Sequence, residues 1–369
     1  MRRRRFIGGL AGLAGAGLGL VPATRGTAWA APGSLGEARE WRAVTTPGAT
    51  AAAQLVDVAA AGPGLAWAVG EEGRGGGVRG TALALVWDGT AWKRTGPAFG
   101  GHLGAVAATP DGSAWAVGTD TSGTARLLAW DGSAWRESDF PGRGTSGTSL
   151  TGVTTGPRGH VWISGRNSGG SVLLHGHQDR WTWVAPPPAT TTVAPSGVHR
   201  APCGDVYVYG DELVARWDGA AWTVLPAPGG IRAGFTGLLA VARDDIWLTG
   251  YDYGVGGPPG KPPGVRLLHG DGTGWEHVTV PFGVGMLTGI VADAQGRPDR
   301  ACGWDFWDQT RAHYLRWDGT AWVSERGPVA STPVVMNALA AVPGSGGGYW
   351  AVGTTSTSAS SAAQLRIER

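Results

Sequence analysis

The chain has 369 residues, of which 66 are Gly, 24 are Pro and 20 are Trp, and only 16% are charged. So many Trp residues argue against disorder despite the high Gly content, and two Cys exclude a disulfide-rich scaffold or a multi-Cys metal centre. The net charge of +2 depends on five Arg in the first 30 residues; without them, 25 basic residues face 28 acidic ones, which argues against nucleic acid as a partner.

The N-terminus predicts an export signal over residues 1–30. Arg2–Arg5 and Phe6 precede a short apolar run, and Ala28-Trp29-Ala30 offers small residues at a cleavage site. The pair Arg3-Arg4 with Phe6 resembles the twin-arginine export motif. We therefore expect a secreted or extracytoplasmic protein with a linker at residues 31–39. The apolar run is too short and too rich in Gly for a stable membrane span, so none is expected after signal removal.

The remaining residues, 40–369, contain one repeat with a period of about 47 residues. A Trp-Asp-Gly-x-x-Trp unit occurs at residues 87–92, 130–135, 217–222 and 317–322. An Ala-Trp-Ala-Val-Gly unit occurs at residues 66–70 and 114–118, and as Tyr-Trp-Ala-Val-Gly at residues 349–353. Short strands with Gly and aromatic marks at this period indicate the blades of a β-propeller.

Each repeat is interpreted as four strands, a to d, from the centre outward. Strand a is a run of small apolar residues, such as residues 103–108, and strand b contains Ala-Trp-Ala-Val-Gly. Strand c ends at an Asp-Gly hairpin that leads to strand d. The last repeat stops after strand c, whereas residues 40–44 resemble an isolated strand d. The sequence therefore predicts an all-β, seven-bladed propeller, closed by an N-terminal strand that completes the last blade.

The repeat resembles the secreted actinobacterial β-propeller proteins whose blades carry Ala-Trp-Ala-Val-Gly followed by Trp-Asp-Gly-Thr-x-Trp. It is more weakly similar to Asp-box and kelch-type propellers, although the Asp-box spacing differs from the adjacent Asp-Gly found here. The resemblance covers residues 40–369 and implies the fold. It does not imply one function, because propellers serve as lectins, lyases, sialidases, oxidases and docking platforms.

Loops between strands b and c are the expected functional face, because they vary between repeats on one end of the ring. The second residue after the Gly that ends strand b is acidic in five of the seven repeats, and the set is Glu72, Asp120, Asn167, Glu212, Asp252, Asp305 and Thr355. One interpretation is that these side chains cap their own turns. The other is that a carboxylate ring at the channel mouth binds a cation such as Ca²⁺, an amine or sugar hydroxyls.

Aromatic residues outside the repeat pattern occur in two neighbouring loops of this kind. They are Tyr251 and Tyr253 in the fifth repeat and Trp304 and Trp307 in the sixth. Aromatic faces beside carboxylates suit sugar rings or cations, although loop packing is the alternative. Weaker candidates for the same mouth are His102, Arg166 and Arg232.

The leading hypothesis is an exported monomer that binds a small-molecule or glycan ligand, above all a carbohydrate or cell-envelope glycan, on the b–c loop face. The second is a secreted lyase, hydrolase or small-molecule cyclase that uses carboxylates at the channel mouth. The third is a protein-docking platform. The sequence leaves these three, and any need for a metal, open.

Overall fold

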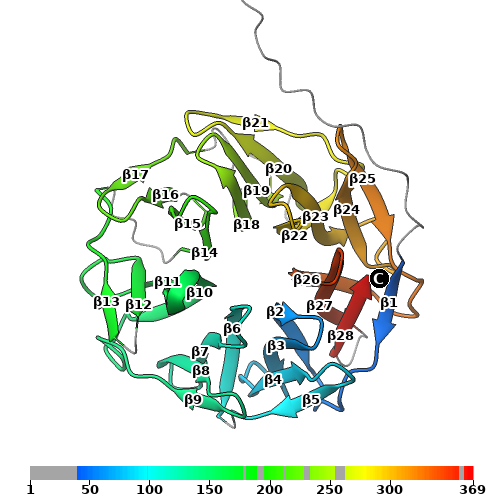
Figure 1. Cartoon of the computed structure of the whole chain (residues 1–369). Helices are drawn as coiled ribbons and strands as arrows, with labels where there is room; N and C mark the ends of the chain where they lie inside the picture. The colour runs from blue at the N-terminus through cyan, green and yellow to red at the C-terminus, as the bar shows by residue number, and fades with distance from the viewer. Residues whose placement is uncertain are drawn as a thin grey trace, which may run out of the picture. The chain divides into compact units, whose positions relative to one another are not determined.

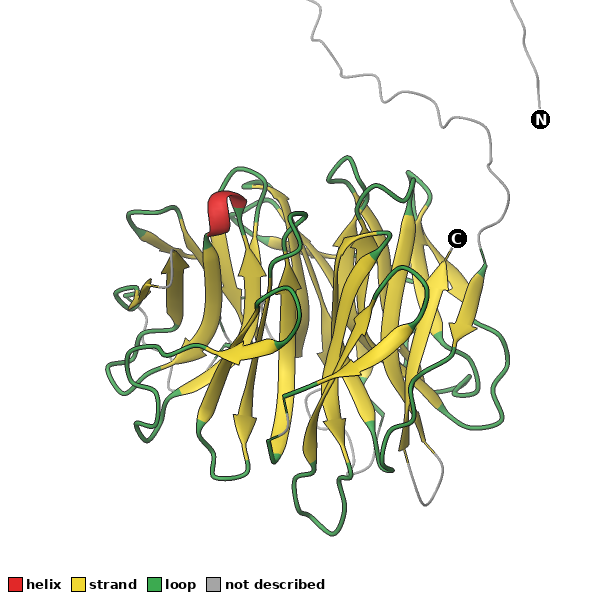
Figure 2. Ribbon diagram, turned by 60° about the horizontal axis from the view of Figure 1, so that its bottom comes forward, coloured by secondary structure: helices red, strands yellow, loops and turns green. Residues whose placement is uncertain are grey.

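The computed structural model describes residues 40–97, 99–177, 180–188, 195–211, 213–227, 233–253, 262–356 and 361–368. These residues form 28 strands and one 3-10 turn, η1 (Pro157–Gly159). Figure 1 shows the strands arranged in sheets around a central axis, and Figure 2 shows the same ring tilted, with long strands running between its two ends. The predicted signal and linker, residues 1–39, lie outside the described residues.

The strands pair into seven four-stranded antiparallel sheets. The first three hold β2 (Gln54–Gly62), β3 (Leu65–Glu72), β4 (Thr81–Trp87) and β5 (Trp92–Thr95); β6 (Gly101–Ala108), β7 (Ala114–Asp120), β8 (Ala125–Trp130) and β9 (Trp135–Glu137); and β10 (Ser149–Thr155), β11 (Val161–Arg166), β12 (Leu173–His177) and β13 (Arg180–Trp183).

The next three sheets follow the same order. They hold β14 (Gly197–Arg200), β15 (Val206–Tyr209), β16 (Val214–Trp217) and β17 (Trp222–Val224); β18 (Ala233–Ala242), β19 (Asp245–Asp252), β20 (Gly264–Gly270) and β21 (Trp275–His277); and β22 (Gly285–Ala292), β23 (Pro298–Asp305), β24 (His313–Trp317) and β25 (Trp322–Arg326). We call these sheets blades 1 to 6. Each consists of four consecutive strands.

The remaining sheet, blade 7, combines both ends of the described chain. It holds β26 (Val334–Val342), β27 (Gly348–Ser356), β28 (Ser361–Glu368) and, on its outer edge, β1 (Trp41–Val44). Trp41 pairs with Glu368 and Val44 with Leu365. The N-terminal strand therefore joins the sheet made by the last three strands, so that no blade is left with three strands.

The Gly that ends strand b has a structural cause. Six innermost strands carry a register shift opposite this Gly, as between Leu55 and Asp57. The shift presses a carbonyl group onto the Gly, and a Cβ on Gly70 would lie 1.9 Å from the oxygen of Gln54. No side chain fits in that space, so the motif keeps Gly there.

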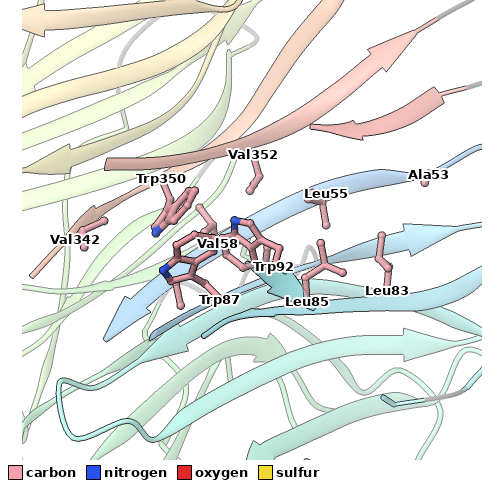
Figure 3. Close-up of a cluster of buried hydrophobic side chains, with 12 residues drawn as sticks. Ala53, Leu55, Val58, Leu83, Leu85, Trp87, Trp92, Val342, Trp350 and Val352 are labelled. Atoms are coloured by element: carbon pink, nitrogen blue, oxygen red, sulfur yellow. The ribbon is translucent and has the colours of Figure 1, made fainter. Parts of the chain in front are cut away.

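Tryptophan rings fill the space between neighbouring blades. Trp350 of blade 7 is 1% exposed and packs against Trp87 and Trp92 of blade 1, with ring centroids 5.1 and 4.9 Å away (Figure 3). Trp67 of blade 1 makes the equivalent contact with Trp130 of blade 2. The repeat's aromatic positions are thus core, because each ring covers the face of two sheets.

Polar side chains on the innermost strands join one blade to the next around the axis. The side chains of Thr236 and Thr288 each donate to a backbone carbonyl of the following blade, at 2.6 and 2.7 Å. Asn337 Nδ2 of blade 7 donates to the Leu55 carbonyl of blade 1 at 2.7 Å. This last bond connects blade 7 to blade 1.

We expect Asn337→Ala to lower the free energy of unfolding by about 1–2 kcal/mol, since it removes the bond to Leu55 O and a longer one, at 3.4 Å, to Thr354 Oγ1. Urea titration of the full chain measures this as a lower midpoint. Gln54→Ala on neighbouring β2 is the control, because the Gln54 side chain makes no hydrogen bond among the described residues. Equal midpoints for Asn337→Ala and the wild type would contradict a stabilising role for the bond.

Candidate functional site

The predicted carboxylates of the b–c loops are mostly buried and engaged within their own blades. Glu72 forms an ion pair with Arg94, Asp120 pairs with Arg126 at 2.7 Å, and Asp252 pairs with Arg266 at 2.5 Å. Each arginine comes from strand c or d of the same blade. The charges are therefore neutralised locally, and Glu212, the fifth acid of the predicted set, lies outside the described residues.

Two of these loops show the capping geometry that one interpretation of the sequence predicts. Asp120 Oδ1 accepts the backbone N–H groups of Ser122 and Thr124, both at 2.9 Å, and Asn167 Oδ1 accepts the N–H of Ser171 at 2.9 Å. The Ser122 hydroxyl donates to the same carboxylate and holds the pKa of Asp120 well below its usual range. These side chains order their loops. A direct role toward a ligand stays a prediction for them.

Glu72 holds a segment outside its own loop. Its carboxylate accepts the Thr50 N–H at 2.7 Å, and the bond from Arg94 lowers the pKa of Glu72 despite its burial. Glu72 therefore anchors the segment that leads into β2. Thr355 lies within β27 and is partly exposed.

Asp305 connects the predicted acidic positions to the aromatic ones. It is buried, and its Oδ1 accepts the N–H of Trp307 at 2.9 Å. His313 Nδ1 and Arg326 Nη2 each lie 4.0 Å from its Oδ2. Burial lowers the pKa of His313, a residue that sequence reasoning missed because nothing in the repeat marks it. Asp305 thus fixes the backbone that presents Trp307.

Blade 6 presents three aromatic side chains from this one loop. Trp304 and Phe306 meet edge to face at 5.9 Å, and Phe306 and Trp307 do so at 4.9 Å. The Trp307 side chain is 76% exposed, although it is among the largest apolar side chains. An indole held this far in solvent has no role in the core.

Blade 5, the neighbouring blade, presents a second aromatic pair. Tyr251 and Tyr253 meet edge to face at 5.2 Å, and Tyr253 is 54% exposed. Tyr251 lies over Gly234, where a Cβ would come within 2.5 Å of the ring, and burial raises the pKa of its hydroxyl. Tyr251 is therefore fixed from below, whereas Tyr253 projects outward.

One backbone segment bonds both blade 5 and blade 6. The N–H of Val265, near the start of β20, donates to Gly283 O at 3.1 Å, and the Phe306 N–H donates to Val284 O at 3.1 Å. The start of β20 and the residue after β23 are therefore both bonded to the connection between those blades. We call the five side chains Tyr251, Tyr253, Trp304, Phe306 and Trp307 the aromatic patch.

The weaker sequence candidates have separate surroundings. His102 lies inside β6 rather than before it, its Nδ1 is 3.0 Å from Arg79 Nη1, and burial lowers its pKa. Arg166 ends β11 and is partly exposed. Arg232 lies outside the described residues. His102 and Arg166 belong to blades 2 and 3, so neither shares a blade with the aromatic patch.

The central channel contains a carboxylate that sequence reasoning missed. A hollow of about 220 Å³ is lined by the innermost strands of all blades, including Asp57 of β2, and by Tyr209 of β15. Asp57 accepts the N–H of Val58 at 2.9 Å and the N–H of Val106 in blade 2 at 2.8 Å. Burial nevertheless raises the pKa of Asp57 to about 7. In the sequence, Asp57 is marked only as a single acid in a strand of small apolar residues. Its hydrogen bonds make it another link between blades.

No group of three or more His, Cys, Asp or Glu side chains among the described residues is arranged to hold a metal ion. No helix in the described part of the chain is long and apolar enough to cross a membrane.

No protein-family model matches the chain, and no curated protein matches its sequence. Solved structures resemble it in fold. YCF48 bound to D1 peptide is 14% identical with a TM-score of 0.56, and the match covers 89% of this chain and 96% of that one. The GH74 xyloglucanase from Xanthomonas campestris is 16% identical with a TM-score of 0.57, covering 86% of this chain but 53% of that one.

A third similar structure is the extracellular domain of the hybrid two component system BT4673 from B. thetaiotaomicron. It is 11% identical with a TM-score of 0.54, and the match covers 90% of this chain and 40% of that one. At these identities the likeness establishes the fold alone. The chain resembles β-propeller proteins in fold.

Proposed function

We propose that this protein is exported and binds a carbohydrate, with cell-envelope glycan as the preferred class, at the aromatic patch. The observation that carries the proposal is the exposure of Trp307 and Tyr253, two of the few large apolar side chains that the described surface leaves in solvent. Pyranose rings have apolar C–H faces that pack on aromatic rings, so an exposed indole and phenol offer the platform a sugar needs.

The surroundings of the patch supply polar groups of the right kind. Asp305 and Asp308 lie in the Trp307 loop, and Arg326 binds Asp308 from β25. Carboxylate and guanidinium groups bond sugar hydroxyls in fixed directions, whereas the rings provide contact area. Export rests on the arginine-rich start of the chain and its small-residue cleavage pattern. A xyloglucanase among the similar structures is compatible with a glycan ligand on this fold.

Trp307→Ala is the most direct test of the patch. We expect the full chain to bind soluble fragments of envelope glycan in isothermal titration calorimetry, and the variant to bind them at least roughly tenfold more weakly, because a stacked aromatic ring contributes on the order of 1–3 kcal/mol. Stability should not change, because the side chain is 76% exposed.

The matched control is Val78→Ala. Val78 is 67% exposed and lies in the b–c loop of blade 1, on the same end of the ring but in another blade. It should bind glycan like the wild type. Equal affinity of Trp307→Ala and Val78→Ala for every glycan bound would contradict the proposal, and shortened or rearranged glycan in the titration mixture would identify an enzyme instead.

A further inference from the structure

A second hollow opens at the opposite end of the ring, among the turns between strands a and b. It measures about 430 Å³ and is lined by the turns of blades 2 and 3 and by the end of β14 in blade 4. The residues of η1 are part of this lining. Figure 2 shows η1 as the red helix, at one end of the strands. The b–c loops, and with them the aromatic patch, lie at the other strand ends.

The charged groups in this lining are unbalanced. Arg158 and Arg200 both line the hollow, and neither has an acidic partner among the described residues. Asp111 is the acid in the lining, and its Oδ1 accepts the Thr109 hydroxyl and the Ser113 N–H of its own turn. Most buried or half-buried arginines elsewhere in the described ring have a carboxylate, as Arg126 and Arg266 do. Two cations therefore face a hollow that holds one acid already engaged in its turn.

Arg200 is held in place for such a role. Its guanidinium carbon lies 5.7 Å from the ring centroid of Trp162, and its Nε is buried without a hydrogen-bond partner. A Cβ on Gly156 would lie 2.9 Å from that Nε, so Gly156 leaves the room that the side chain occupies. Packing against Trp162 and Gly156 thus fixes the stem of this side chain, and Arg200 lines the hollow.

Arg158 occupies a costly backbone conformation. Its φ is 60° and its ψ 30°, and it is the one non-Gly residue with positive φ among those described. A left-handed residue with a Cβ costs roughly 1–2 kcal/mol, and Gly would avoid this cost. Strain of this kind marks sites where the side chain serves a purpose.

We propose that this hollow binds an oxyanion, the shared chemistry of carboxylates and phosphate esters, between Arg158 and Arg200. Guanidinium groups bind such anions through paired N–H donors with matching geometry. The anionic group would belong to a molecule that approaches the end of the ring opposite the aromatic patch. This site is independent of the proposed glycan site, because the two share no residue.

Arg158→Gly tests the proposal without damaging the fold. The substitution relieves the left-handed strain, so the variant should unfold at the same or a higher temperature than the wild type while it loses anion binding. The probes are inorganic phosphate and succinate, each compared with chloride at equal ionic strength, in thermal unfolding and calorimetry of the full chain. We expect at least one probe to bind the wild type and to bind Arg158→Gly roughly tenfold more weakly.

The remaining outcomes also decide the proposal. Arg200→Gln should weaken binding of the same probe. If Arg200→Gln also disturbs packing on Trp162, the binding measured for Arg158→Gly still tests the site. Binding of phosphate alone assigns a phosphate ester, binding of succinate alone assigns a carboxylate, and binding of both supports the oxyanion site itself. Arg42→Ala, an exposed arginine in β1, is the control and should bind like the wild type. The proposal is overturned if neither probe raises the unfolding temperature or releases binding heat relative to chloride, or if the wild type and Arg158→Gly bind the probe equally.

Discussion

Trp350→Ala is expected to lower the free energy of unfolding by about 3–5 kcal/mol, the usual cost of removing a large buried aromatic side chain. Trp350 is 1% exposed and lies in one cluster with Trp87, Trp92 and Leu85 of blade 1 (Figure 3). The indole joins blade 7, which contains both ends of the described chain, to blade 1. The cavity left by Ala would therefore open at the junction that closes the ring.

The midpoint of urea unfolding measures this effect, with the wild type and Trp307→Ala titrated in parallel. Trp307→Ala removes the same ring from a position that is 76% exposed, so its midpoint should equal that of the wild type. Comparable losses for both variants would show that burial between blades does not determine the stability of this fold.

Gly353→Ala is expected to destabilise the ring at least as much as ordinary overpacking, by about 1–3 kcal/mol or more. A Cβ at this position would lie 2.0 Å from the carbonyl oxygen of Val335 and 2.9 Å from the Cα of Met336. Both atoms are backbone, so the innermost strand itself would have to move. Reduced soluble yield and a lower unfolding midpoint are the measurements.

Gly274→Ala is the matched control for that substitution. Gly274 has no atom within 4 Å of an added Cβ, and its counterparts in other hairpins are Ala91, Ala134, Ala221 and Ala321. Replacing it should leave stability unchanged or raise it by about 0.4–1 kcal/mol, because the unfolded chain loses freedom. A loss at Gly274 equal to that at Gly353 would mean that crowding at the register shift is not the reason for Gly in the motif.

The β-propeller fold could be predicted from the sequence because its repeat is marked by Trp and Gly, two residue types that are easy to recognise. Trp and Gly recur at fixed spacing, and each has a local cause: Trp fills the space between blades, and Gly accommodates a carbonyl group pressed against strand b. Residues 40–44 could be placed in the last blade because the final repeat lacks its outer strand. Both inferences use the spacing of the repeat alone.

The contacts of the candidate residues were harder to predict, because they depend on side chains of the next strands that the repeat pattern does not mark. The alignment of Glu72, Asp120 and Asp252 predicted a recurring acid, but not the arginine that each one binds on a later strand. For Trp307 the sequence left two alternatives open, contact with a ligand and packing within the loop. Trp307 is 76% exposed, and its role toward a ligand stays a prediction.

The hydrogen bonds between blades could not be predicted from the repeat. Asp57 and Val106 are 49 residues apart, and Asn337 and Leu55 are 282 apart, yet both pairs are hydrogen bonded around the axis. Arg158 carries no sequence mark of its left-handed backbone, because an Arg before a Gly is ordinary in a turn. The two hydrogen bonds follow from the packing of blades around the axis, whereas the Arg158 conformation belongs to one a–b turn of blade 3.

Binding of one envelope-glycan preparation to the wild type, Trp307→Ala and Arg158→Gly, measured side by side on an immobilised glycan surface, tests the central claim most directly. The account predicts that the wild type and Arg158→Gly bind equally and that Trp307→Ala binds at least roughly tenfold more weakly. Equal binding by all three proteins, or loss of binding in Arg158→Gly alone, would contradict the assignment of the glycan site to the aromatic patch.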